Sequence, residues 1–330
     1  MVYRPILRRV LFLTPFLAPF LALFLAAPWF INLGTAAPAA ADTPSFQDVV
    51  SAVVGVRSTV PDQARTAETL GTEREGSGIV IDDRGLVLTI GYVIMEAEAV
   101  EILRADGTAV PAARLAYDHA TGFGLVRARE PLDVRPMPLG TAAALEEGDT
   151  AIAVSHAGPR TVTPVRLASR RPFAGYWEYL LEDALFTVPP HPLFGGAALV
   201  NRAGELIGVG SLQVNDALPG DEPVAGNMFV PVDGLKPILA DLLARHRAPG
   251  PALPWLGIGT QETHGRMLVV RVTPGGPADR AGLAPGNVIL GVGGRRVSDL
   301  VDFQRRVFAA GHAGDDIPLD LVAINDDGWS

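Results

Sequence analysis

The sequence predicts an all-β protein of two domains, from the pattern of its strands and from one linker. Short apolar segments follow one another at close intervals, separated by turns that contain Gly, Asp and Pro, which is typical of antiparallel barrels. Residues 248–253 begin with Ala248-Pro249-Gly250-Pro251, a linker composition, and a second series of such segments follows. The 330 residues are enough for two separate hydrophobic cores.

The first 41 residues have the pattern of an export signal. Arg4, Arg8 and Arg9 precede an apolar run that extends from Val10 to about residue 33, and an Ala-rich segment ends at Ala41. We expect a signal peptide cleaved near Ala41. The apolar run is also long enough to span a bilayer, so the alternative is a signal anchor that is not cleaved. Either alternative places the remainder in the periplasm or on the inner membrane facing it.

Composition excludes several classes of function. Hydrophobic residues make up 48% and charged residues 19% of the chain, as in a globular protein, and the net charge of −9 argues against nucleic acid as a partner. The chain has no Cys, which excludes thiol catalysis, disulfides and Cys-ligated metal. The six His show no metal-ligand spacing, so we expect neither a metal nor a cofactor.

The N-terminal strands can be assigned from local patterns. Residues 46–57 predict a short helix that leads into a strand, and residues 61–75 are polar with mixed charge, which predicts a surface loop. Residues 76–89 predict a β-hairpin, because two apolar segments flank the turn Asp82-Asp83-Arg84-Gly85.

The remaining strands of the first domain follow at short intervals. We expect strands over residues 99–103, 151–154, 162–167 and 179–186. Residues 235–247 predict an amphipathic helix that ends this domain, because five apolar side chains recur at helical spacing.

Two segments of this domain resemble trypsin-like serine proteases of the HtrA/Deg family. They are the hairpin from Gly76 to Thr89, and Phe194-Gly195-Gly196 with the following Gly204-Glu205-Leu206-Ile207-Gly208. The resemblance implies that residues 42–247 form a trypsin-like double six-stranded β-barrel. It also implies where a catalytic triad would lie.

None of the three implied triad positions carries the family's residue. The position of the catalytic His, three residues after Thr89, holds Tyr92, the orienting Asp falls on Gly122, and the nucleophilic Ser falls on Phe194. Phe has no nucleophilic atom, and a phenol with a pKa near ~10 is a poor general base at neutral pH. The position of one oxyanion-hole N–H holds Pro192, which has none to donate. We therefore expect no peptidase activity.

Residues 254–330 resemble the PDZ domain that follows the protease domain in this family, a small β-barrel with two helices. The resemblance rests on Pro254-Trp255-Leu256-Gly257-Ile258, on residues 272–289 and on a helix over residues 300–307. It implies that the backbone N–H groups of Leu256, Gly257 and Ile258 capture a peptide carboxylate. Phe303 and Val307 would line the pocket.

Together these features predict a non-catalytic HtrA/Deg-like pseudoprotease. Its expected ligands are C-terminal or extended peptides and unfolded proteins, and the resemblance implies envelope protein quality control as the process. One alternative is an active serine endopeptidase with a relocated site, for which Ser155–His156 and Ser211 are candidates. Another is a regulatory subunit in a homo-oligomer or a mixed oligomer with active paralogues, with Phe46 as a contact residue. We expect His119 and His191 to be loop residues rather than bases.

Overall fold

The computed structural model describes residues 43–329, apart from 157–160, 221, 264, 323, 326 and 327. The signal peptide or anchor expected over residues 1–41 lies outside the described residues. Thr43–Ser330 form one compact unit. In the part of the chain that is described, no helix combines the length and the apolar character needed to cross a membrane.

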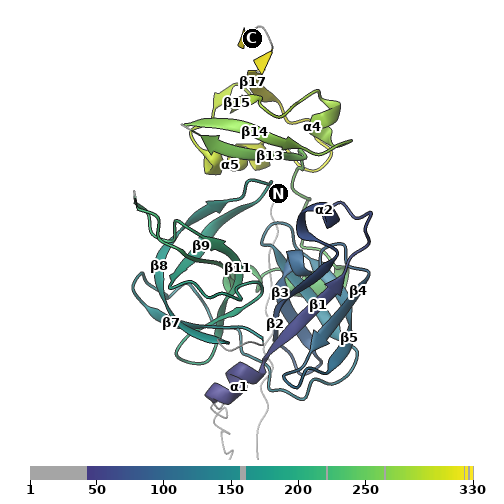
Figure 1. Cartoon of the computed structure of the whole chain (residues 1–330), viewed down its shortest axis with the longest axis vertical. Helices are drawn as coiled ribbons and strands as arrows, with labels where there is room; N and C mark the ends of the chain where they lie inside the picture. Colours follow the sequence, from purple (N-terminus) through teal and green to yellow (C-terminus); the bar gives the residue numbers. More distant parts are fainter. Residues whose placement is uncertain are drawn as a thin grey trace, which may run out of the picture. The chain divides into compact units, whose positions relative to one another are not determined.

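The first part of this unit is a closed six-stranded antiparallel barrel (Figure 1). Its strands follow the order β1-β2-β3-β6-β5-β4 around the barrel. They are β1 Val53–Thr59, β2 Glu73–Val80, β3 Leu86–Ile90, β4 Ala99–Leu103, β5 Ala109–Tyr117 and β6 Phe123–Ala128. Helix α1 (Phe46–Ser51) precedes it and begins at a capping box, in which the side chains of Ser45 and Asp48 accept each other's backbone N–H groups.

A second closed six-stranded barrel follows, in the order β10-β11-β12-β9-β8-β7 (Figure 1). Its strands are β7 Thr150–Val154, β8 Val162–Ala174, β9 Leu180–Val188, β10 Ala198–Val200, β11 Leu206–Val214 and β12 Gly226–Pro231. Buried side chains from both barrels, Val54 and Val230 among them, belong to one contiguous apolar cluster. The double six-stranded barrel predicted from the sequence is therefore confirmed.

The C-terminal part is a small sheet with two helices. The sheet has the order β13-β14-β15-β16, and β17 pairs with β15. Its elements are β13 Ile258–Thr263, β14 Arg266–Val272, α4 Pro277–Arg280, β15 Val288–Val292, β16 Arg295–Arg296, α5 Leu300–Ala310 and β17 Leu319–Val322. Two further strands, β18 (Ile324–Asn325) and β19 (Gly328–Trp329), pair with each other. Phe303 and Val307 of α5 are fully buried against this sheet.

Two sequence-based assignments need correction. The segment 61–75 is not wholly a loop, because it contains α2 (Ala67–Leu70), and β2 begins at Glu73, which pairs with Thr59. The helix predicted over 235–247 is shorter: a 3-10 turn η2 (Val232–Gly234) comes first, and α3 extends over Leu239–Arg245. Pro237 explains the late start, because it lacks a backbone N–H and disfavours helical geometry in the residue before it.

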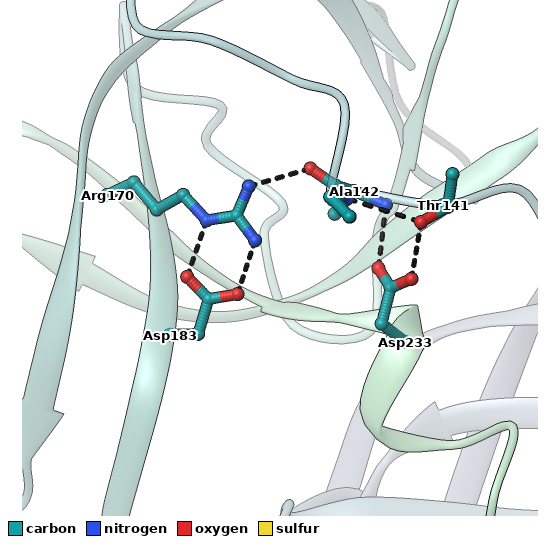
Figure 2. Close-up of polar contacts among 6 residues, drawn as sticks. Thr141, Ala142, Arg170, Asp183 and Asp233 are labelled. Atoms are coloured by element: carbon teal, nitrogen blue, oxygen red, sulfur yellow. Dashed lines mark hydrogen bonds and ion pairs between the residues drawn. The ribbon is translucent and has the colours of Figure 1, made fainter.

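Thr141 and Ala142, in the segment that joins the two barrels, form hydrogen bonds with the charged side chains of Arg170 and Asp233 (Figure 2). Arg170 of β8 forms a bidentate pair with Asp183 of β9, and its Nη1 donates to the carbonyl of Ala142 at 2.8 Å. The Asp233 carboxylate accepts the Ala142 N–H at 2.6 Å and the Thr141 hydroxyl at 2.5 Å. The start of the second barrel is thus held by charge-assisted hydrogen bonds, the stronger kind.

Candidate functional site

The loop from residue 189 to residue 197, here called the Phe194 loop, is held by backbone hydrogen bonds. The N–H of Ser77 donates to the Gly195 carbonyl at 2.8 Å, and the N–H of Gly196 donates to the Gly210 carbonyl at 2.8 Å. Gly196 has φ +74°, and a Cβ built on it would lie 1.9 Å from the Ser77 carbonyl oxygen. Only glycine fits there, which explains why the Gly195-Gly196 pair is present although Phe194 precedes it.

Tyr92 lies beside this loop, on the 3-10 turn η1 (Gly91–Val93) that follows β3. Its hydroxyl donates to the Ser211 carbonyl at 2.9 Å and lies 2.9 Å from the position that a Cβ on Gly195 would take. Burial raises the pKa of the Tyr92 phenol well above its usual value. The group is therefore a protonated hydrogen-bond donor at neutral pH and is not available as a base.

Gly122 lies in the turn before β6 and is joined to the residue that precedes Tyr92. The N–H of Gly91, the neighbour of Tyr92, donates to the Gly122 carbonyl at 2.7 Å. Gly122 has φ +79°, and the Tyr179 hydroxyl lies 3.4 Å from the position of an added Cβ. The structure thus brings Tyr92, Gly122 and the Phe194 loop together from three separate segments of the chain.

Asp118 and His119 precede Gly122 and have structural surroundings. The buried Asp118 carboxylate accepts the N–H of Thr121 at 2.9 Å and its hydroxyl at 2.6 Å, which closes the turn. His119 is exposed and lies edge-on against Tyr117, with ring centroids 4.3 Å apart. Partial desolvation of its ring lowers the pKa of His119, and the nearby Asp118 opposes that shift.

The residues weighed for a relocated nucleophile do not form a Ser–His pair. Ser155 Oγ is buried and has no hydrogen-bond partner among the described residues. The neighbouring His156 uses its backbone N–H, which donates to Ser77 Oγ at 2.9 Å. Ser211 presents its carbonyl to Tyr92.

His191 is fully buried within the Phe194 loop. Its N–H donates to Asn227 Oδ1 at 2.5 Å, and its Nδ1 lies 2.8 Å from Thr163 Oγ1. Burial lowers the pKa of the imidazole, which favours its neutral form. Because no part of His191 reaches the surface, its pairing with Thr163 is closed to a polypeptide substrate.

The second candidate site is the loop Leu256-Gly257-Ile258, here called the 256–258 loop, at the start of β13. Gly257 has φ +77°, and the three successive N–H groups converge on one oxygen, Glu178 Oε1, at 3.1, 2.7 and 3.1 Å. Such a concave set of N–H groups binds anions. Phe303 and Val307 lie in the same apolar cluster as Leu256 and Ile258.

Glu178 was not identified from the sequence. It lies 78 residues before Leu256, at the tip of the β8–β9 hairpin, and no local pattern links the two segments. The only signal in the sequence is the aromatic run Tyr176-Trp177, which interrupts the polar composition expected of a hairpin tip.

Comparison with known families gives two matches. Residues 76–209 match the trypsin-like peptidase domain, and residues 254–322 match the PDZ domain. The match to the trypsin-like peptidase domain includes Tyr92 and Phe194, and the match to the PDZ domain includes the 256–258 loop.

Individual relatives align with most of the chain. The chain is 30% identical over 260 residues to a putative serine protease HhoA of Synechocystis sp., covering 72% of this chain and 64% of that protein. It is 24% identical over 270 residues to the serine endoprotease DegS of Escherichia coli K12, covering 76% and 73%. The chain therefore spans somewhat less than two thirds of HhoA and 59% of the related HhoB.

Solved structures agree on the fold. The HtrA-type protease AlgW with a tripeptide aligns with a TM-score of 0.51 at 20% identity, covering 87% of this chain and 95% of that one. A serine endoprotease from Yersinia pestis aligns with a TM-score of 0.50 at 22% identity, covering 87% and 95%. At these identities the likeness is one of fold.

Proposed function

Because the chain belongs to the HtrA/Deg-like family, with a trypsin-like peptidase domain followed by a PDZ domain, we propose that it is a non-catalytic member that binds peptides or partner proteins. The proposal rests on one observation. Tyr92, Gly122 and Phe194 belong to segments that lie together where the family resemblance places the triad, and these three residues offer no nucleophile and no base. The imidazole of His191 in the Phe194 loop is fully buried.

The magnitude of the loss supports the proposal. Removing a single member of a Ser-His-Asp triad typically lowers the rate by ~10⁴-fold. Here all three positions differ from the family pattern. The buried Tyr92 phenol stays protonated, and Pro192 removes one N–H from the position of the oxyanion hole. Loss of one oxyanion-hole N–H typically lowers the rate by a further ~10²–10³-fold, so the changes together leave little acyl-transfer activity.

Peptide binding is assigned to the PDZ domain. The N–H groups of Leu256, Gly257 and Ile258 already coordinate a carboxylate oxygen, which is the chemistry needed to hold a peptide C-terminus. Phe303 and Val307 supply apolar surroundings for the last side chain. The ligands on this proposal are C-terminal or extended peptides, including those of unfolded proteins.

The place of action on this proposal is the periplasm, either in solution or attached to the inner membrane. The basic start, apolar run and Ala-rich end of residues 1–41 support export. Quality control of envelope proteins is a process consistent with such a location.

Hydrolysis of casein tests the absence of catalysis. Residues 43–330, purified from a host that lacks HtrA-type proteases, should cleave casein no faster than the Phe194→Ala variant. A fluorophosphonate probe should label no Ser in either protein. Cleavage by both proteins, together with a labelled Ser, would establish instead an endopeptidase with a relocated nucleophile.

The exposed side chain of Phe46 favours a second function, as a subunit of a mixed oligomer. This ring precedes the first barrel and is 62% exposed, which is unusual for a large apolar side chain in the described part of the protein. Co-purification with an active HtrA-type protease, lost in Phe46→Ser, would support a regulatory subunit. Co-purification that Phe46→Ser leaves unchanged would exclude Phe46 as the contact.

A further inference from the structure

A carboxylate from the second barrel lies in the 256–258 loop of the PDZ domain. Glu178 Oε1 accepts hydrogen bonds from Leu256, Gly257 and Ile258, the shortest being 2.7 Å from Gly257. Burial raises the pKa of the Glu178 carboxyl, and the three N–H groups oppose that shift. The Glu178 side chain is half-buried, so its carboxylate loses part of its solvation and depends on these donors.

The backbone next to Glu178 adds to the sheet as a strand would. The N–H of Thr260 in β13 donates to the carbonyl of Tyr176 at 2.7 Å. Tyr176 comes two residues before Glu178, and Thr260 comes two residues after Ile258, so the two segments run in opposite directions. β13 is at the end of the sheet order, where its outer edge is otherwise open to a further strand.

Helix α5 also forms hydrogen bonds with the β8–β9 hairpin. Gln304, whose side chain is buried, donates from Nε2 to the Trp177 carbonyl at 3.1 Å. Arg305 donates from Nε to Glu182 Oε1 at 2.8 Å and from Nη2 to Oε2 at 2.5 Å. Residues 175–179, here called the β8–β9 tip, therefore contact the loop, the edge strand and the helix of the PDZ domain.

The tip is itself an ordered structure. The N–H of Gly175 donates to the Tyr179 carbonyl at 2.9 Å, and the rings of Trp177 and Tyr179 stack with centroids 5.7 Å apart. Tyr179 also donates to the Thr121 carbonyl at 2.9 Å, beside Gly122. A prearranged hairpin loses little conformational entropy on docking, which favours it over a flexible peptide at the same place.

We propose that the β8–β9 tip is an internal ligand of the PDZ domain, in which the Glu178 side chain takes the place of a peptide C-terminus. A peptide with a free C-terminal carboxylate binds the 256–258 loop only after Glu178 has left it. This inference rests on the proposed peptide-binding function and adds its regulation. Affinity is then set by competition: the apparent Kd equals the intrinsic Kd divided by the fraction of molecules with an open loop.

Peptide titration of the full chain tests this competition. The probe is a fluorescein-labelled peptide, Phe-Ala-Gly-Tyr-Trp-Val, which repeats residues 173–177, has Val in place of Glu178 and ends there in a free carboxylate. Glu178→Ala should bind it about tenfold or more tightly than the wild type, because the internal carboxylate no longer competes. Glu178→Gln should give an intermediate gain, because an amide oxygen still accepts hydrogen bonds, but without charge.

Two matched controls isolate the carboxylate. The same peptide with an amidated C-terminus should bind neither protein measurably. Glu182→Gln removes an acid from the same hairpin and breaks the exposed pair with Arg305, but it keeps Glu178. It should change the affinity less than twofold, since exposed ion pairs contribute little. A gain as large as that of Glu178→Ala would assign the effect to charge rather than to the 256–258 loop and would overturn the inference.

Amide hydrogen exchange separates failure of this inference from failure of the proposed function. In Glu178→Ala without peptide, the N–H groups of Gly257 and Thr260 should exchange at least about tenfold faster than in the wild type. Faster exchange without any peptide binding would retain the internal ligand and contradict the peptide-binding function. Equal peptide affinities, or unchanged exchange, in a variant with unaltered thermal unfolding would overturn the internal ligand.

Discussion

The Phe194 loop and the 256–258 loop are both fixed by backbone hydrogen bonds, yet they depend on side chains to different degrees. A hydrolytic site at the Phe194 loop needs three specific side chains, and Tyr92, Gly122 and Phe194 supply none of the required groups. The 256–258 loop acts through three N–H groups, which almost any residue can provide. Substitutions that remove the first kind of chemistry leave the second intact.

The comparison also explains why Gly195 and Gly196 are present in the Phe194 loop although it has no nucleophile. Gly195 and Gly196 lie where a side chain would meet Tyr92 or the Ser77 carbonyl. These glycines serve the packing of the two barrels against each other, and packing is required whether or not catalysis occurs. We therefore expect the glycine frame of this loop to matter for stability.

The largest expected effect is that of Gly196→Ala. The added Cβ would lie 1.9 Å from the Ser77 carbonyl oxygen, so the backbone must move. The alanine would also have to adopt φ +74°, which is unfavourable for a residue with a side chain. The variant should lose about 4 kcal/mol of unfolding free energy, measured by denaturant titration. Gly107→Ala is the control: it has φ +83° but nothing within 4 Å, so only the conformational strain of about 1 kcal/mol remains. Equal losses would show that the Phe194 loop is not tightly packed.

Gly257→Ala examines the other loop. A side chain at φ +77° strains the backbone that directs three N–H groups at one oxygen, and its Cβ would lie 3.3 Å from the Trp255 ring. In the Glu178→Ala background, where the internal ligand is absent, we expect about tenfold weaker binding of the carboxylate peptide. Wild-type peptide affinity in this double variant would mean that the loop tolerates distortion and that its backbone does not fix the carboxylate.

Local sequence patterns predicted several of the strands, and the family resemblance implied the double barrel that they form. The hairpin at 76–89 and strand β4 could be found from apolar segments and turn residues, because strand formation there agrees with local preference. The late start of α3 follows from Pro237, a local signal that the apolar periodicity of residues 235–247 obscured. The strand in residues 73–75 was missed because its polar side chains are kept extended by pairing with β1, which is a tertiary effect.

The contact of Glu178 with the 256–258 loop could not be predicted from the sequence. It depends on the length of the β8–β9 hairpin and on its reach to another domain, and both follow from the folded backbone rather than from any motif. The motif for carboxylate binding was visible at Leu256-Gly257-Ile258, but its occupant was not. A residue that completes a backbone site from a distant segment leaves no periodic pattern, and the aromatic run Tyr176-Trp177 marks the hairpin tip without indicating what it contacts.

Tyr92→Phe should have the smallest effect on unfolding free energy. It tests the contribution of the side chain that lies beside the Phe194 loop. The variant keeps the ring and its packing but removes the hydrogen bond to the Ser211 carbonyl, which should cost ~1 kcal/mol of unfolding free energy. Tyr176→Phe is the matched control, because that side chain is 63% exposed and its hydroxyl can bind water instead, so no change is expected. Denaturant unfolding of both variants decides the matter. A neutral Tyr92→Phe would mean that the phenol hydroxyl does not link the two barrels, and that Tyr92 contributes through its ring alone.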